Sequence, residues 1–265
     1  MKFSITSDAY DINQSIDERL RHFSIAGFTH VHWCEHWTSD IFYSKSYAEE
    51  IAQKAGKYGI RIQNIHGVCR LHRNRPLTGS HWVDLNANRI QFISWLGGDC
   101  IVLHVPLDDC ERGFESERDE SERLIRLLIP EAKKQNVRLA IENIESRPCK
   151  RLFDHLFQTF PSEELGFCFD SGHANIMGEI DILERYLDRL IMTHLHDNHG
   201  YTDEHLLPGE GTLPWKPIVL NLNKKPNLAF VNLEAYWSRT IPKKDWCCQA
   251  YQSIQALWRQ YGQAS

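Results

Sequence analysis

The chain has 265 residues, of which 42% are hydrophobic and 25% are charged, a composition typical of an ordinary soluble globular protein. Its formal net charge of −5 excludes a general electrostatic attraction to nucleic acid or to anionic membranes. No stretch reaches the roughly 18 consecutive apolar residues of a membrane span. The eight cysteines show no CxxC spacing and no signal segment follows Met1, so we expect reduced thiols in a cytoplasmic protein.

Short apolar runs that favour β-strands recur along the chain. They cover Lys2–Thr6, Thr29–Trp33, Arg61–Ile65, Cys100–Val105, Arg138–Ile141, Gly166–Phe169, Leu190–Leu195 and Asn227–Leu233. Between most of them lie segments with the amphipathic period of helices. The clearest are Ser46–Tyr58, Leu85–Leu96, Ser121–Gln135 and Asp245–Tyr261, and the least regular is Leu213–Leu222, which Pro217 shortens.

Eight strands that alternate with helices predict a fold of the α/β class with a parallel sheet. In a chain of this length they predict a (β/α)₈ TIM barrel, a single domain over residues 1–265. A doubly wound open sheet is the alternative. It would need fewer strands, and it would not place polar residues after nearly every strand.

Polar residues follow the predicted strands from the third to the eighth. They are His66, His104, Glu142, Asp170 with His173, His194 and Glu234, and the loop after the seventh strand adds Asp203 and His205. The carboxyl ends of barrel strands converge on one face, so we expect these side chains to meet there. Buried imidazoles and carboxylates are costly unless they are paired or bound to metal. Their types suit zinc, manganese or a similar divalent ion, and their number suits one to three ions.

Each residue also has a purely structural interpretation. A single histidine at a strand end, such as His66, is more often a hydrogen-bonded core or rim residue, and Asp170 is a good helix cap. The joint occurrence of the set favours the metal site. Arg70 and Arg73 follow the third strand and belong either to a solvated loop or to a clamp for an anionic substrate group. His32 is a further candidate for substrate binding.

Seven segments carry a family resemblance. They are Asn64–Gly67, Val102–Pro106, Ala140–Asn143, Asp170–Asn175, His194–Asn198, Asp203–His205 and Pro208–Gly211. Together they resemble the xylose isomerase-like barrel superfamily, which includes sugar isomerases, epimerases and the endonuclease IV type of abasic-site endonuclease. The epimerase type of site implies Glu142, Asp170, His194 and Glu234 as metal ligands. The endonuclease type implies five more, which are His66, His104, His173, Asp203 and His205.

We therefore expect a divalent-metal-dependent isomerase or epimerase of carbohydrate metabolism. It would act on a sugar, sugar phosphate or related polyol by proton transfer through a metal-stabilised enediolate. Glu142 and Glu234 would be the general base and acid, and His196 would orient a hydroxyl or assist proton transfer. Its partner would be a small carbohydrate, with neither a membrane nor nucleic acid involved.

An endonuclease IV-like phosphodiesterase with two or three metals is the alternative, because all nine ligand positions carry the residue types that it needs. Against it, a DNA-binding face needs clustered Lys and Arg, and only the Arg70–Arg75 loop offers them. Against the ketose 3-epimerases, Asp197–Gly200 stands where those enzymes have a glutamate followed by an arginine. Lyase chemistry and metal or sugar binding without turnover also stay open.

Overall fold

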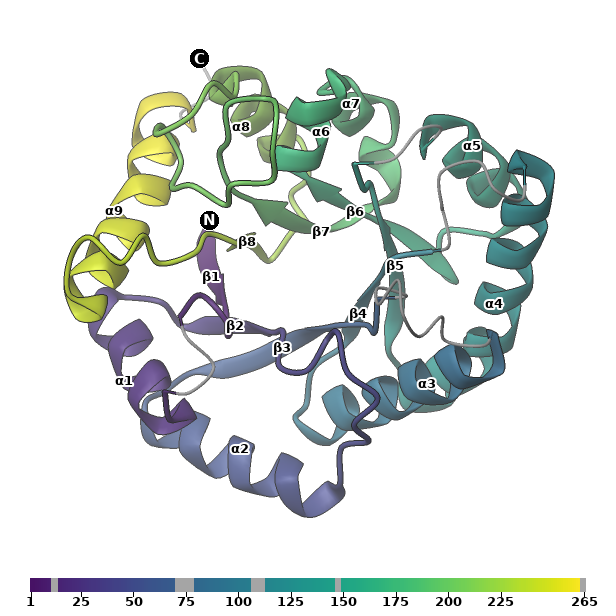
Figure 1. Cartoon of the computed structure of the whole chain (residues 1–265), viewed down its shortest axis with the longest axis horizontal. Coiled ribbons are helices and arrows are strands. Elements are labelled where there is room, and N and C mark those ends of the chain that lie inside the picture. The colour runs from purple at the N-terminus through teal and green to yellow at the C-terminus, as the bar shows by residue number, and fades with distance from the viewer. Residues whose placement is uncertain (11–13, 70–78, 106–112, 146–148, 263–265) are drawn as a thin grey trace.

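Eight parallel strands close into a barrel in this computed structural model (Figure 1). The strands are β1 Lys2–Thr6, β2 His30–Trp33, β3 Arg61–His66, β4 Cys100–Leu103, β5 Arg138–Glu142, β6 Leu165–Asp170, β7 Leu190–Leu195 and β8 Phe230–Leu233. Each strand pairs with the next in the sequence, and β1 closes the ring against β8. The structure describes residues 1–10, 14–69, 79–105, 113–145 and 149–262. The predicted TIM barrel is confirmed, and the doubly wound alternative is wrong because the sheet has no edge.

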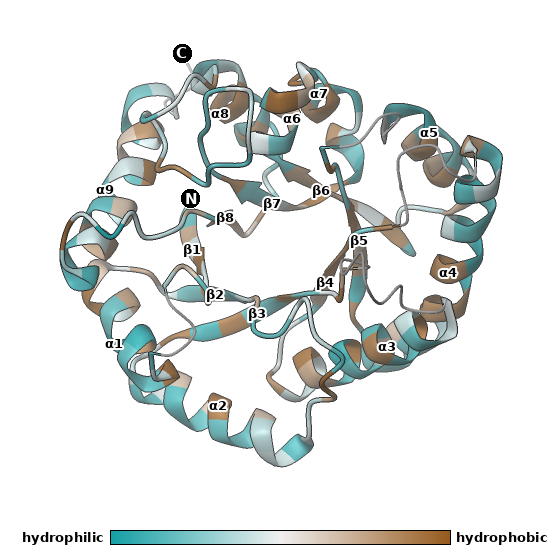
Figure 2. Ribbon diagram, in the orientation of Figure 1, coloured by the Kyte–Doolittle hydropathy of each residue, from teal (hydrophilic) through white to brown (hydrophobic). Residues whose placement is uncertain are grey.

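A ring of helices surrounds the barrel (Figure 1). They are α1 Ile16–Ala26, α2 Lys45–Lys57, α3 Gly79–Trp95, α4 Phe114–Gln135, α5 Cys149–Thr159, α6 Ser171–Met177, α7 Ile182–Arg185, α8 Trp215–Asn223 and α9 Lys243–Tyr261, with a 3₁₀ turn, η1, at Leu187–Arg189. The four clearest predicted helices are confirmed as α2, α3, α4 and α9. Hydrophilic and hydrophobic residues alternate along these helices, as the amphipathic pattern requires (Figure 2).

Local sequence signals set several helix ends. Ser15 and Ser44 cap α1 and α2, because their side chains accept hydrogen bonds from the backbone N–H of Glu18 and Tyr47. Helix α1 ends at Gly27, whose φ of 112° lies in the region that glycine tolerates best. These ends fix where the chain turns back toward the next strand.

Two hydrophobic clusters fill the molecule. The larger one packs the outer faces of the strands against the helices. The smaller one is made of Cys100, Val102, Ala140, Cys168, Met192 and Phe230. Because side chains alternate along a strand, Ala140, Cys168 and Met192 share their strand faces with the residues two positions later, at the carboxyl ends of the strands. The smaller cluster is therefore the apolar floor inside the barrel, beneath the strand ends.

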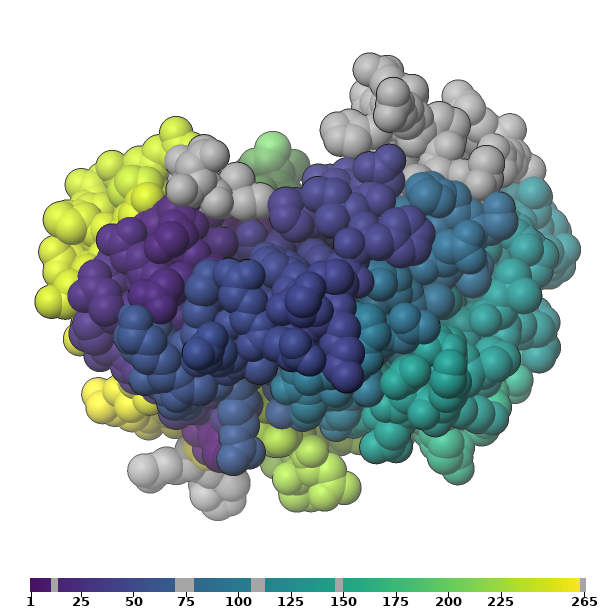
Figure 3. Space-filling model, turned by 90° about the horizontal axis from the view of Figure 1, so that it is seen from below, coloured from purple at the N-terminus to yellow at the C-terminus, as the bar shows by residue number. Residues whose placement is uncertain are grey.

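The helices cover the wall of the barrel when it is seen from the side, where α1 and α2 form much of the near surface (Figure 3). Within the part of the chain that the structure describes, no helix is long and apolar enough to cross a membrane. In barrels of this kind, active sites lie at the carboxyl ends of the strands and in the loops that follow them, so we expect the functional residues there.

Candidate metal centre

Four ligand-type side chains meet at the carboxyl ends of adjacent strands. Glu142 and Asp170 are the last residues of β5 and β6, His194 lies near the end of β7, and Glu234 follows β8. One candidate ligand atom from each lies within 4.8 Å of those of the other three, and all four residues are buried. The sheet register contributes to this meeting, because Asp170 pairs directly with His194 across β6 and β7. These are the four residues that the epimerase type of site implied.

The contacts inside this four-residue group leave polar atoms without partners. His194 Nδ1 lies 2.9 Å from Glu142 Oε1 and 2.9 Å from Glu234 Oε2. Asp170 Oδ1 accepts a hydrogen bond of 2.7 Å from the backbone N–H of His173. Within the described part of the chain, Asp170 Oδ2 and His194 Nε2 are buried without a hydrogen-bond partner. Buried polar atoms are rarely left unpaired, so this group has the donor set and the unused ligand capacity that fit a divalent cation.

The charges in the group act on each other. Burial raises the pKa of Glu142, but the opposing charges of His194 and His104 outweigh it and hold the pKa well below its usual range. The pKa of Glu234 falls to about 2 because the facing charge of His194 outweighs burial. Burial lowers the pKa of His194, yet its interactions with Cys168, Glu142 and Glu234 outweigh burial and raise the pKa well above its ordinary value. The buried carboxylates therefore favour a positive charge between them, and a bound metal ion would supply it.

A second group lies next to the first at the ends of β3 and β4. His104 Nε2 lies 3.0 Å and His66 Nε2 lies 3.5 Å from Glu142 Oε2. On the other side of both rings stands Cys69, whose sulfur is 3.1 Å from His104 Nδ1 and 3.9 Å from His66 Nδ1. The sequence pattern predicted both histidines as ligands but no cysteine among them.

The loop after β7 brings three further candidates over the barrel. Asp203 Oδ2 lies 2.9 Å from His205 Nε2 and 3.5 Å from His173 Nε2. His196 Nε2 lies 3.2 Å from Asp170 Oδ2 and 3.5 Å from Asp203 Oδ1. The rings of His196 and His205 stack at 4.1 Å, and His205 stacks in turn on Tyr236. The structure thus brings the nine predicted ligand positions and His196 into one contiguous cluster.

Asp197 holds this loop in place. Its backbone forms an antiparallel bridge with Leu206. Its fully buried carboxylate accepts hydrogen bonds from the indole N–H of Trp215 at 2.9 Å and from the backbone N–H of Gly209 at 2.8 Å and Leu213 at 3.1 Å. Asp197 is a ligand-type residue by its sequence neighbours, but its contacts are structural.

The three predicted substrate-binding residues have different outcomes. Arg70 and Arg73 lie outside the described residues. His32 is fully buried beneath the site, where its ring stands 4.7 Å from that of His194. Its Nδ1 faces Asn64 Oδ1 at 2.5 Å, and its Nε2 has no hydrogen-bond partner in the described part of the chain. His32 therefore contacts the metal-type group from below.

Sequence reasoning missed two residues of the site. Cys69 follows His66 by three positions on the same strand end, which was the available signal. Asp8 follows β1 by two positions, and loss of solvent raises the pKa of its carboxyl to about 6, with the charge of Glu234 adding to the effect. Both residues follow the carboxyl end of a strand, on the face of the barrel where the sequence pattern predicts the site.

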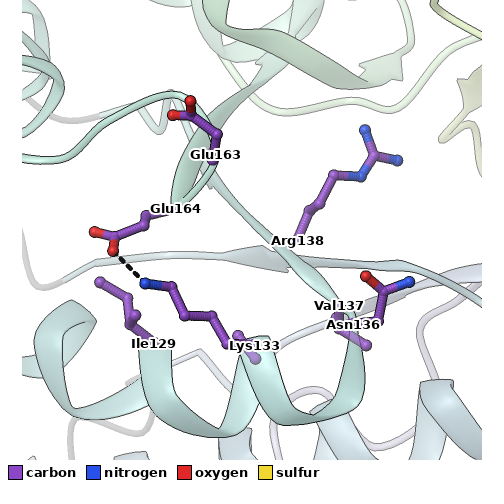
Figure 4. A pocket seen from close by; sticks show the side chains of 8 residues that line it. Ile129, Lys133, Asn136, Val137, Arg138, Glu163 and Glu164 are labelled. Atoms are coloured by element: carbon purple, nitrogen blue, oxygen red, sulfur yellow. Dashed lines mark hydrogen bonds and ion pairs between the residues drawn. The ribbon is translucent and has the colours of Figure 1, made fainter.

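A pocket elsewhere is separate from this site. Arg138, Lys133, Glu163 and Glu164 line it, and Lys133 pairs with Glu164 at 2.6 Å (Figure 4). Arg138 begins β5, whereas Glu142 ends it, so this pocket opens at the opposite end of the barrel. Its charged side chains pair with each other or with neighbours at the surface, as Arg138 does with Asp99, so they are not arranged for catalysis.

Residues 21–257 match the protein family described as xylose isomerase-like TIM barrel. The chain belongs to this family. An uncharacterized protein, y4fM of Sinorhizobium fredii, is 32% identical over an alignment of 237 positions that covers 76% of this chain and 76% of its own length. The 3-oxo-isoapionate decarboxylase of Pectobacterium atrosepticum is 24% identical and aligns over 69% of this chain and 64% of its own length.

Solved structures of this xylose isomerase-like family share the fold. A D-tagatose 3-epimerase-like protein superposes with a TM-score of 0.73 at 20% identity, over 98% of this chain and 99% of its own. The IolI protein, solved with a bound zinc atom, superposes with a TM-score of 0.81 at 14% identity, over the same shares of the two chains. At these identities the likeness concerns the fold alone.

Proposed function

We propose that this protein is a divalent-metal-dependent isomerase or epimerase of a sugar, sugar phosphate or related polyol. The observation that carries the proposal is the position of two buried carboxylates, Glu142 and Glu234, each 2.9 Å from His194 Nδ1. They come from β5 and β8, so they approach a common centre from different parts of the barrel wall. A proton can then be removed on one side of a bound substrate and returned on the other.

Glu142, Asp170, His194 and Glu234 would hold the metal, as three carboxylates and one imidazole suit manganese or zinc. When bound, the ion supplies positive charge beside the carbon that loses its proton and so makes that proton more acidic. The structure of IolI with zinc supports this assignment by fold.

The side chains divide the remaining work. Glu142 and Glu234 would exchange the carbon-bound proton: the ionised carboxylate takes it as the base, and the other carboxyl, which must carry a proton from solvent at that moment, returns one as the acid. His196 is fully buried with both ring nitrogens free of hydrogen bonds to the described residues, so it can orient a substrate hydroxyl. Asp203 and His205 border the site from the loop after β7, where they contact His173 and His196.

The test is exchange of the carbon-bound proton in deuterated water. The metal-loaded protein is incubated with a panel of ketoses, their phosphates and 3-oxo sugar acids, and deuterium uptake, epimerised products and lost carbon dioxide are measured. Glu142→Gln should reduce exchange by about 10²- to 10⁴-fold. Glu163→Gln, which changes an exposed carboxylate at the opposite end of the barrel, is the control and should keep full exchange. Full exchange by Glu142→Gln with metal still bound would overturn the proposal.

A phosphodiesterase of the endonuclease type is the second candidate. It is favoured by the contacts of His66 and His104 with Glu142, and of His173 and His205 with Asp203. It predicts cleavage of a duplex that contains an abasic site, which stops when the metals are chelated. No cleavage by a fully metal-loaded protein would remove this candidate.

A further inference from the structure

The imidazoles of His66 and His104 each stand between two different groups. Their Nε2 atoms face Glu142 Oε2, at 3.5 Å and 3.0 Å respectively. Their Nδ1 atoms face Cys69 Sγ, at 3.9 Å and 3.1 Å. The sulfur and one ring nitrogen of each histidine lie within 4.8 Å of one another. Cys69 and His66 are buried and His104 is partly exposed, so the group is enclosed but within reach of solvent.

We infer that His66, Cys69 and His104 form a second metal site, with sulfur as a ligand and zinc as the preferred ion. The inference goes beyond the proposed function, because it concerns residues outside the four-residue group and requires no sugar substrate. It also differs from the endonuclease type of site, in which the two histidines would bind metal together with Glu142 and no sulfur would take part.

The two sulfur–nitrogen separations fit a tetrahedral ion. Zinc binds sulfur at about 2.3 Å and imidazole nitrogen at about 2.0 to 2.1 Å, which places the two kinds of ligand atom roughly 3.5 Å apart. The observed separations of 3.1 Å and 3.9 Å lie on either side of this value. A thiolate with two imidazoles favours zinc over manganese, because soft sulfur ligands select soft or borderline ions.

Glu142 completes the arrangement from the other side. A histidine that binds metal through one ring nitrogen usually donates its other N–H to a carboxylate or a carbonyl group, which fixes the ring. His104 would bind through Nδ1 and donate its Nε2–H to Glu142 Oε2. Binding releases the thiol proton of Cys69, and the hydrogen with which His66 Nδ1 contacts the carbonyl oxygen of Gly67 at 2.8 Å moves to Nε2, which faces Glu142. Glu142 would then link the two sites, since its Oε1 faces His194.

Cobalt substitution tests the inference directly. The chelator-stripped, reduced protein is titrated with Co²⁺, which gives a near-ultraviolet charge-transfer band only when a thiolate binds the ion. Wild type should show the band, and Cys69→Ser should lose it together with one zinc ion per chain by elemental analysis. Cys248→Ser removes a thiol from α9, a helix that contributes no residue to the site, and should keep both. His104→Ala, which leaves the thiol in place, should weaken zinc binding at the site by at least tenfold.

The outcomes separate this site from the four-residue group. Asp170→Asn should keep the band and lose a different ion. No band in cobalt-saturated wild type, or a band that survives in Cys69→Ser, would overturn the inference, and the wild-type spectrum decides even if a variant fails to fold. Asp170→Asn with unchanged metal content would instead contradict the metal site of the proposed function and leave the sulfur site standing.

Discussion

Asp170 and His173 are joined by a hydrogen bond of 2.7 Å, from the backbone N–H of His173 to Asp170 Oδ1. Through it Asp170 caps helix α6. Its other oxygen, Oδ2, lies 3.2 Å from His196 Nε2 and has no hydrogen-bond partner among the described residues. One carboxylate therefore caps a helix and keeps a second oxygen without a hydrogen-bond partner, so the structural interpretation of this residue is confirmed and its ligand role stays a prediction.

The interaction of His205 with Asp203 predicts how stability depends on pH. Burial lowers the pKa of His205, but its hydrogen bond and charge interaction with Asp203 outweigh burial and raise the pKa to about 9. Because a histidine in an unfolded chain titrates near 6.5, this stabilisation is complete below about pH 6.5 and is lost as pH rises through about 9. We expect the free energy of unfolding of the metal-free protein to fall in this window, measured by urea denaturation with a chelator present.

Asp203→Asn is the control for that window. It removes the charge that raises the pKa of His205, and Asp203 itself stays ionised throughout the window in wild type. The variant should therefore show a shallower decline, by on the order of 2 to 3 kcal/mol over the window. Equal declines in the two proteins would exclude this pair as the cause.

Asp197→Ala should destabilise the fold. It leaves four donors without their acceptor, the indole N–H of Trp215 and the backbone N–H groups of Asn198, Gly209 and Leu213. Hydrogen bonds to a charged group each contribute about 1.5 to 3 kcal/mol, so we expect a loss of about 3 kcal/mol or more in the free energy of unfolding. Asp188→Ala, at an exposed position, should change stability by less than about 0.5 kcal/mol. Similar effects of the two changes would show that the Asp197 contacts contribute little.

Gly172→Ala should displace His196. A Cβ atom at position 172 would lie 1.9 Å from His196 Cε1, so the buried ring must shift to make room for it. Overpacking of this kind costs about 1 to 3 kcal/mol, measured as a loss of unfolding free energy. Gly56→Ala in α2 meets nothing within 4 Å and should stabilise by about 0.5 to 1 kcal/mol. A tolerated alanine at position 172 would mean that His196 is not held against the helix.

His196→Gln should slow proton exchange about 100-fold while metal content is unchanged, because His196 serves the substrate rather than the four-residue group. Its control is His199→Gln, an exposed histidine paired with Glu204. Loss of a metal ion from His196→Gln would instead make His196 a ligand.

The barrel was predictable because alternation of apolar runs with helical segments leaves few folds for eight strands. The same alternation predicted that four polar side chains would lie close together, since each lies at or just beyond the carboxyl end of an apolar strand. They are Glu142, Asp170, His194 and Glu234. The ends of helices were less predictable. Helix α3 begins at Gly79, and the sequence pattern predicted its start at Leu85 because the first turns of this helix carry little hydrophobic periodicity. Which side chains of neighbouring strands touch depends on the register between the strands, and the register cannot be read from the sequence.

Asp197 and Asp203 illustrate the remainder. Both are acidic residues of one loop, yet one anchors backbone and indole donors and the other meets His173 and His205. Only the fold of the loop separates their roles. Cys69 was overlooked because its two imidazole partners lie at the ends of two different strands, β3 and β4. One of them, His104, is 35 positions away from Cys69 in the sequence.

The most direct test of the proposed metal centre is the anomalous diffraction of a crystal soaked in manganese. We expect an ion among Glu142, Asp170, His194 and Glu234, with one atom of each side chain at roughly 2.0 to 2.2 Å. Density for manganese at other positions, with none among these four residues at saturating metal, would contradict the proposed centre.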